Sequence, residues 1–145
     1  MENKYYNIDE GKRLVLFDGM PNTPTDIDGC YDCHGKGWIF YESKCVETPE
    51  HYQARKEREL SGKDTGQEIC LRRLVEDTTK AGKKSIAIIC EHDFPKDMTT
   101  PVILKDCKVR KYIFTGHKNW ITPKTDVTVE ELSVWFIDEI EGKHE

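Results

Sequence analysis

A glutamate and a lysine at alternate positions close an apolar stretch of this sequence. The run Trp38 to Tyr41 is followed directly by Glu42, Ser43 and Lys44. Because alternate residues of a strand point to the same face, the Glu42 carboxylate and the Lys44 amine should lie on one side of a sheet. A buried strand that ends in such a pair commonly serves chemistry, so both residues are candidate catalytic groups.

A second carboxylate, Asp28, stands fourteen residues before Glu42, within the segment 25–29. Two carboxylates that converge repel one another unless a divalent cation lies between them. Ligands that are all oxygen favour Mg²⁺ or Mn²⁺. A lysine beside such a cation can orient or help deprotonate an attacking water and can stabilise charge on a phosphate. Together these groups indicate phosphodiester hydrolysis.

A β-hairpin is the element that must position these groups. The segments 27–33 and 38–45 read as strands, and they flank the glycine-rich turn 34–37. The length of the turn decides which face Asp28 occupies, because a shift by one residue moves a side chain to the other face.

Two registers of this hairpin are open to the sequence. A four-residue loop, 34–37, would set Asp28 opposite Ser43 and aim it away from the charged pair. A three-residue loop, 35–37, sets Asp28 opposite Lys44, and glycine suits the left-handed positions of such loops. We expect the three-residue loop, in which the charged groups converge.

The rest of the chain alternates between strand and helix patterns, without internal repeats. Short apolar runs predict strands at 14–17, 85–90, 102–104 and 109–114, and the unbroken run 85–90 is typical of a central strand covered on both faces.

Helical spacing predicts helices in three places. A charged segment, 53–60, reads as a short helix or an ordered arm. A second helix is predicted over 67–81 and ends at Gly82. The residues that share one face of it are Gln67, Leu71, Leu74, Val75 and Thr78. A last helix opens on a capping box of Thr128 and Glu131, and its apolar stripe for docking on the sheet consists of Leu132, Trp135, Phe136 and Ile140.

This layout resembles the PD-(D/E)XK nuclease superfamily, with Asp28 as the first acid and Glu42-Ser43-Lys44 as the Glu-x-Lys triplet. In particular it resembles small phage-encoded proteins in four segments: Thr-Asp-Ile-Asp-Gly at 25–29, Glu-x-Lys at 42–44, a Gln-led helix at 67–81 and an Ala-Ile-Ile-Cys-Glu-His-like strand at 87–92. The resemblance covers roughly 13–140. It implies an α/β fold with a restriction-endonuclease-like core of order α-β-β-β-α-β, in which helices flank a central mixed sheet.

The resemblance also implies roles for four residues. Asp28 and Glu42 would be metal ligands for Mg²⁺ (Mn²⁺ possible), Lys44 would position the water, and Gln67 would face the site from its helix. Asp26 competes with Asp28, but Asp28 follows an apolar residue and has the separation from Glu42 that the family shows. The chain departs from the family at the proline before the first acid, a place that an isoleucine occupies here.

The function expected on these grounds is Mg²⁺-dependent hydrolysis of DNA, and a homodimer would suit a small nuclease that cuts both strands. The alternative is a non-catalytic regulator that retains the fold and binds nucleic acid or protein. Scattered cations and one tryptophan could follow the phosphates or form an ordinary solvated surface; they are Arg55, Lys56, Arg58, Arg72, Arg73, Lys108, Arg110, Lys111, Lys118 and Trp120.

A rival metal signal comes from Cys30-Tyr31-Asp32-Cys33-His34, which matches a zinc knuckle and a haem-attachment motif superficially. A zinc site would need His34 or Cys45 to complete it, because the remaining cysteines are scattered singly. We therefore expect free thiols, and Mg²⁺ rather than zinc.

Composition sets wider bounds. A chain of 145 residues suits one domain, 1–145, and a formal charge of −5 argues against broad coating of nucleic acid while allowing a local basic groove. The amino-terminal residues lack the apolar core of a signal peptide, and no apolar run approaches a membrane span, so we expect a cytoplasmic protein, in the host cytoplasm if phage-encoded. Motifs of P-loop, Gly-x-Ser-x-Gly and His-Glu-x-x-His type are absent from the sequence.

Overall fold

A four-stranded mixed sheet forms the centre of the computed structural model, which describes residues 27–46, 53, 56–57, 64–93 and 103–143. The strands are β1 (Gly29–Asp32), β2 (Gly37–Val46), β3 (Lys84–Asp93) and β4 (Lys108–Phe114), in that order across the sheet. Neighbours β1 and β2 are antiparallel, β2 and β3 are parallel, and β3 and β4 are antiparallel. The predicted strands of the hairpin and at 85–90 and 109–114 are confirmed.

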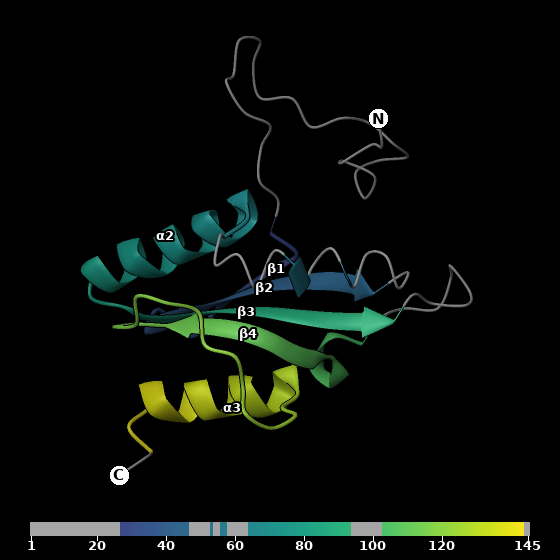
Figure 1. The fold of residues 1–145 in the computed structure, drawn as a ribbon. Coiled ribbons are helices and arrows are strands. Elements are labelled where there is room, and N and C mark those ends of the chain that lie inside the picture. The colour runs from purple at the N-terminus through teal and green to yellow at the C-terminus, as the bar shows by residue number, and fades with distance from the viewer. Residues whose placement is uncertain (1–26, 47–52, 54–55, 58–63, 94–102, 144–145) are drawn as a thin grey trace, which may run out of the picture.

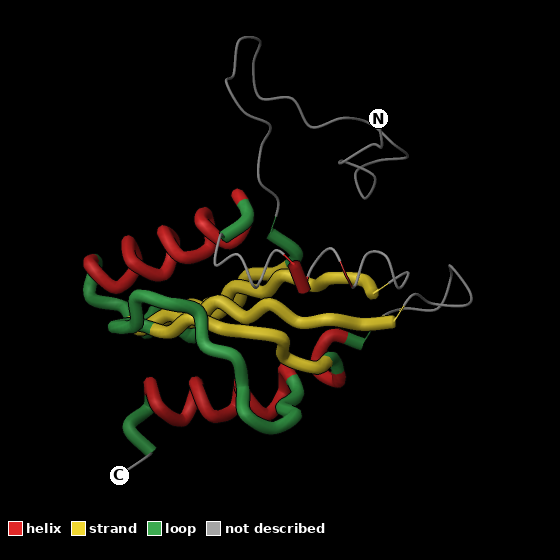
Figure 2. Tube along the Cα trace, in the orientation of Figure 1, coloured by secondary structure: helices red, strands yellow, loops and turns green. Residues whose placement is uncertain are grey.

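Helices cover both faces of this sheet. Helix α2 (Gly66–Lys80) lies on one side and α3 (Val129–Ile140) on the other, which gives three layers (Figures 1 and 2). The parallel pair β2 and β3 requires a crossover, and α2 lies within that connection. The expectation of an α/β fold with a mixed sheet between helices is confirmed.

The strand β3 runs through the core, as its apolar sequence predicts. Residues 85–90 are all buried, and alternate residues pack on opposite sides. Ile86 and Ile88 belong to a cluster with Phe136 of α3, whereas Ala87 and Ile89 belong to a cluster with α2. A central strand covered on both faces explains why the run shows no polar alternation.

Helix α2 begins and ends where local signals place it. The Thr65 side chain accepts a hydrogen bond from the Glu68 N–H, and the Glu68 side chain accepts one from the Thr65 N–H, which makes a capping box. At the other end Gly82 has a φ of 89°, the left-handed conformation that terminates helices. Leu71 and Val75 are buried against the sheet, so the predicted apolar face is confirmed.

The predicted capping box of Thr128 and Glu131 at the start of α3 is confirmed. The prediction that Trp135 belongs to the buried stripe of this helix is wrong. Leu132 and Phe136 are buried, whereas Trp135 is 39% exposed and touches Phe114 edge-on with ring centroids 5.5 Å apart. Each residue turns about 100° around a helix, so Trp135 falls at the margin of a stripe centred on Leu132 and Phe136.

The strand predicted at 102–104 is wrong within its described part. Leu104 opens a 3₁₀ turn (Leu104–Asp106), closed by hydrogen bonds from the Asp106 N–H to the Ile103 carbonyl and from the Cys107 N–H to the Leu104 carbonyl. Ile103 is 50% exposed, so a short apolar run here reflects a turn rather than a buried strand. The predicted strand at 14–17 lies outside the described residues, as does most of 53–60, where Gln53, Lys56 and Glu57 are helical.

The register of the hairpin differs from the expected one. Gly29 pairs with Tyr41 and Asp32 with Trp38, and the Cys33 N–H donates to the Gly37 carbonyl at 2.9 Å. The loop is therefore 34–36, three residues long but one position earlier than 35–37. His34 and Gly35 adopt positive φ angles of 53° and 77° there.

Gly37 serves close packing rather than the turn. It lies in β2 opposite Lys84 of the parallel strand, and a Cβ at this position would overlap the Lys84 carbonyl oxygen. The glycine that the sequence suggests for the loop is thus required by the neighbouring strand.

Candidate functional site

The face of β2 toward α2 carries both charged candidates of the opening motif. Phe40 packs with Leu71 and Val75 of α2, and Glu42 and Lys44 follow on the same face by alternation. Glu42 is 4% exposed, an unusual degree of burial for a carboxylate. The site therefore lies under α2, at the carboxyl ends of the parallel strands β2 and β3.

Gln67 reaches this site from the first turn of α2. The Lys44 Nζ donates a hydrogen bond to Gln67 Oε1, across 23 positions of the sequence. The structure thus brings together two of the predicted site residues from different elements. Glu91 of β3 is level with Lys44 in the parallel register and adds a carboxylate at the same strand ends.

Asp28 sits in a bend immediately before β1. Because Gly29 pairs with Tyr41, Asp28 is level with Glu42, not with Lys44 as the expected register had it. Its Oδ2 accepts a hydrogen bond from the Ser43 N–H at 2.7 Å. In a continued antiparallel ladder a backbone carbonyl would accept this N–H, so the Asp28 carboxylate ends the strand pairing beside Glu42. Its competitor, Asp26, lies outside the described residues.

An ion pair that the sequence does not reveal borders the site on its other side. Glu42, Ile89 and Lys111 lie in register across β2, β3 and β4. Lys111 pairs with Glu68 of α2, and the two side chains are only 13% and 7% exposed. The Lys111 ammonium also lies 5.4 Å from the ring centroid of Trp120. A buried ion pair is costly to desolvate, and costly buried charges gather at functional sites. The Lys111–Glu68 pair therefore supports a functional site near Glu42.

Sequence reasoning missed Glu68 and Glu91 as residues of this site, and it named Lys111 only as one of the scattered cations. The spacing of Thr65 and Glu68 is a visible capping-box signal, although it does not predict an ion pair. Lys111 faces α2 by alternation with Ile113, and a register shift between Val109 and Lys111, where Arg110 is an extra residue, turns Val109 to the opposite face. A bulge of this kind leaves no clear mark in the sequence.

The first turn of α2 thus spans a polar network of two carboxylates, two lysines and an amide: Glu42, Glu68, Lys44, Lys111 and Gln67. The charges of these two carboxylates and two lysines balance, and Asp28 and Glu91 add negative charge at the same strand ends. The position of the network at a helix amino terminus favours added negative charge, such as a phosphate.

Oxygen ligands at the site fit Mg²⁺ better than a cation that needs a full protein cage. Asp28, in the bend before β1, and Glu42 of β2 supply carboxylates at level positions, and Mg²⁺ commonly binds through one or two carboxylates while keeping several waters. Within the described residues no group of three or more His, Cys, Asp or Glu side chains is arranged to hold a metal. Asp28 and Glu42 are the described residues that would hold such a hydrated ion.

The cysteine motif does not converge. In β1, Cys30 is opposite Phe40, on the α2 side, whereas Cys33 is buried in the cluster that contains Phe136. Burial, followed by the charge of Asp32, raises the pKa of both thiols, which disfavours the thiolate form that zinc binds. The pair thus points to opposite faces of the sheet.

Several of the predicted phosphate-binding cations are held in ion pairs. Arg72 lies 2.9 Å from Asp64, and Lys108 lies 3.2 Å from Asp126, in addition to the Lys111 pair. Lys56, Arg73 and Lys118 are exposed, whereas Arg55 and Arg58 lie outside the described residues.

Comparison with known proteins found no matching family model, no matching curated protein and no matching solved structure. No helix among the described residues has the length and apolar character of a membrane span.

Proposed function

We propose that this chain is a metal-dependent nuclease of PD-(D/E)XK type that hydrolyses phosphodiester bonds of DNA. The observation that carries the proposal is the burial of Glu42 beside Lys44, with Lys44 hydrogen-bonded to Gln67 at the carboxyl ends of two parallel strands. Buried charge at strand ends is costly and is characteristic of catalytic sites.

The order of elements supports a restriction-endonuclease-like core. The hairpin of β1 and β2, the crossover helix α2 and the parallel strand β3 follow one another as β-β-α-β. This order corresponds to the later part of α-β-β-β-α-β. In this proposal β4 and α3 are additions to that core, and β4 forms the edge of the sheet beside β3.

Each residue of the site has a distinct role in the proposed reaction. Asp28 and Glu42 would hold Mg²⁺, which when bound polarises the phosphate and lowers the pKa of a water molecule. Lys44 would hold the attacking water in line with the phosphorus and stabilise charge on the phosphoryl oxygens. Gln67 fixes the Lys44 ammonium through its amide oxygen, so the lysine enters the reaction already oriented.

The test is Mg²⁺-dependent cleavage of single-stranded, duplex and branched DNA by the wild type and by Glu42→Gln. The substitution keeps the shape of the side chain and removes its charge, and we expect a loss of activity of at least about 100-fold. Glu76→Gln is the matched control, because Glu76 is exposed on α2. Cleavage that survives Glu42→Gln at the wild-type rate would refute the proposal.

A second candidate is a non-catalytic regulator that binds DNA. It is favoured by the pairing of Lys44 with Gln67 and of Lys111 with Glu68, which gives both lysines a partner without an added ion. This candidate predicts DNA binding that EDTA does not weaken, with no cleavage in Mg²⁺ or Mn²⁺. The nuclease predicts metal-dependent cleavage on the same substrates.

A further inference from the structure

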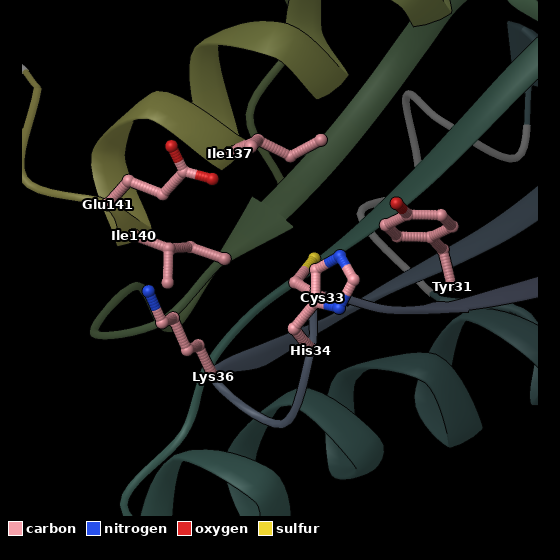
Figure 3. Close-up of a pocket in the computed structure, with 7 residues that line it drawn as sticks. All are labelled: Tyr31, Cys33, His34, Lys36, Ile137, Ile140 and Glu141. Carbon is pink, nitrogen blue, oxygen red and sulfur yellow. The ribbon is translucent and has the colours of Figure 1, made fainter.

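A pocket of about 220 Å³ lies on the opposite side of the sheet from Glu42, between the hairpin turn and the last turn of α3. Figure 3 shows its lining, with Tyr31 on one side and Ile140, Lys36 and Glu141 on the other. The volume is below the roughly 300 Å³ of ordinary small-molecule sites, so it suits a ring system rather than a drug-sized ligand.

The inner wall of this pocket is apolar. It consists of Cys33, which is buried, and of Ile137 and Ile140, which pack against the same core cluster. The rings of Tyr31 and His34 supply flat surfaces beside it. A planar ring can therefore be held by burial on its faces.

The rim offers one donor group and one acceptor group. Lys36 carries a cation, and Glu141 carries a carboxylate that pairs with Lys143 at 2.8 Å. The Lys143 ion pair, with smaller contributions from Lys36 and His34, lowers the pKa of Glu141, so its carboxylate is an acceptor at neutral pH. Charges of both signs at the rim favour a neutral ligand with an acceptor and a donor on one edge over an anion or a cation.

The hairpin turn, which carries His34 and Lys36, is held in place by two hydrogen bonds. The Gly35 N–H donates to Asp32 Oδ1 at 2.8 Å, and the Lys83 Nζ donates to the Gly35 carbonyl. A ligand would therefore meet a preformed wall, which lowers the entropy cost of binding.

We propose that this pocket binds a neutral planar heteroaromatic ring of nucleobase size, with the ring against Tyr31 and the apolar wall and its polar edge toward Lys36 and Glu141. The adjacent carbonyl and N–H groups of guanine or uracil match this edge. The proposal does not depend on the metal site, which lies on the other face of the sheet.

The experiment is a ¹H–¹⁵N NMR titration of the full chain with guanosine and uridine, in the absence of metal, beside benzoate and benzylamine as an anionic and a cationic probe. We expect the nucleosides to shift amides of residues 31–37 and 137–143. Lys36→Ala and Glu141→Gln should each weaken binding about tenfold, whereas Lys124→Ala, at an exposed lysine outside the lining residues, should not.

Three results would overturn the proposal: no shifts with either nucleoside in the millimolar range, tighter binding of benzoate or benzylamine than of the nucleosides, or binding that both rim variants leave unchanged. Folding of each variant is verified from its unshifted core amides. Because no metal or cleavage enters this measurement, its outcome is separate from that of the nuclease assay.

Discussion

Lys44 is the residue at which the proposed catalytic role and a role in packing are easiest to separate. Its ammonium, at the end of an aliphatic stem, hydrogen-bonds to Gln67. Lys44→Met keeps the stem and removes the charge. We expect DNA cleavage to fall by at least about 100-fold, because the water and the phosphate lose a positioned cation.

The accompanying measurement is chemical denaturation of the same variant. Lys44 is partly exposed, so Lys44→Met should change the free energy of unfolding by less than about 1 kcal/mol. Lys124→Met is the matched control for charge, since Lys124 is exposed in a loop. If cleavage fell equally in both variants, the role of Lys44 would be wrong.

Glu68 and Lys111 make a buried pair whose loss on one side should be costly. Glu68→Gln retains a residue that can complete the capping box but leaves the Lys111 charge without its carboxylate. We expect a loss of about 3 kcal/mol in the free energy of unfolding. The double variant Glu68→Gln/Lys111→Met should recover most of it, because neither charge is then buried.

Urea denaturation of the two single variants and the double variant gives the coupling energy. A value of about 2 kcal/mol or more is expected for a pair this buried. Additive effects of the two substitutions would show that the pair contributes nothing specific.

At this scale the sequence predicts faces better than registers. A three-residue loop at 35–37 and one at 34–36 both leave Asp28 level with an even-numbered residue of β2, so the expected face does not depend on which loop forms. The glycine at position 37 is required by its contact with Lys84, a residue 47 positions away. Contacts of that range are not encoded in local spacing.

At the scale of elements, Gly37 is the position at which the hairpin depends most on the neighbouring strand β3. A Cβ there would overlap the Lys84 carbonyl and approach Ile140 Cδ1 to 3.0 Å. Backbone of a central strand cannot move aside cheaply, so we expect Gly37→Ala to lower the free energy of unfolding by about 2 kcal/mol. Thermal or urea denaturation measures the change.

Gly66→Ala is the comparison for this substitution. A Cβ at Gly66 meets nothing within 4 Å, and alanine favours the first turn of a helix. A neutral or slightly stabilising effect is expected. Equal losses in both variants would show that the close approach of β2 to β3 is not the cause.

Elements with local signals are the ones that the sequence predicts well. Capping-box spacing and Gly82 place the ends of the two helices, and the apolar run 85–90 places β3. The errors fall where local pattern is ambiguous. Ile103 and Leu104 are apolar enough for a strand but form a turn, and Trp135 keeps helical spacing while lying at the edge of the buried face.

At the scale of the whole molecule, the sheet separates two kinds of surface. The face under α2 carries the charged network at the carboxyl ends of β2 and β3, whereas the face under α3 carries a largely apolar cluster and the pocket at the hairpin turn. The hairpin of β1 and β2 contributes to both, with Asp28 at one end and the turn at the other. One short element therefore links the proposed metal site and the proposed ligand site without bringing them together.

The buried thiols make the free energy of unfolding of the whole molecule depend on pH in the alkaline range. Burial, with the neighbouring Cys107 as the next contribution, raises the pKa of Cys90 from 9.0 to about 12. The folded chain thus favours the neutral thiol. Between pH 9 and pH 12 ionisation of Cys90 stabilises the unfolded chain but not the folded one. The contribution of Cys90 to the free energy of unfolding is therefore fully present below pH 9 and is lost as the pH rises.

Urea denaturation between pH 8 and pH 10.5 tests this dependence in the wild type and in Cys90→Ala. Above pH 9 the Cys90 contribution should steepen the wild-type loss by up to about 1.4 kcal/mol per pH unit, and Cys90→Ala should remove that part although it is less stable at pH 8. Cys33, Cys107 and Tyr41, which also have raised pKa values, remain in both proteins. Because Cys107 and Tyr41 each interact with Cys90, the difference between the two slopes reports Cys90 together with its coupling to these two groups. Parallel slopes would mean that the Cys90 thiol ionises as readily in the folded chain as in the unfolded one, which is incompatible with its burial between the sheet and α3.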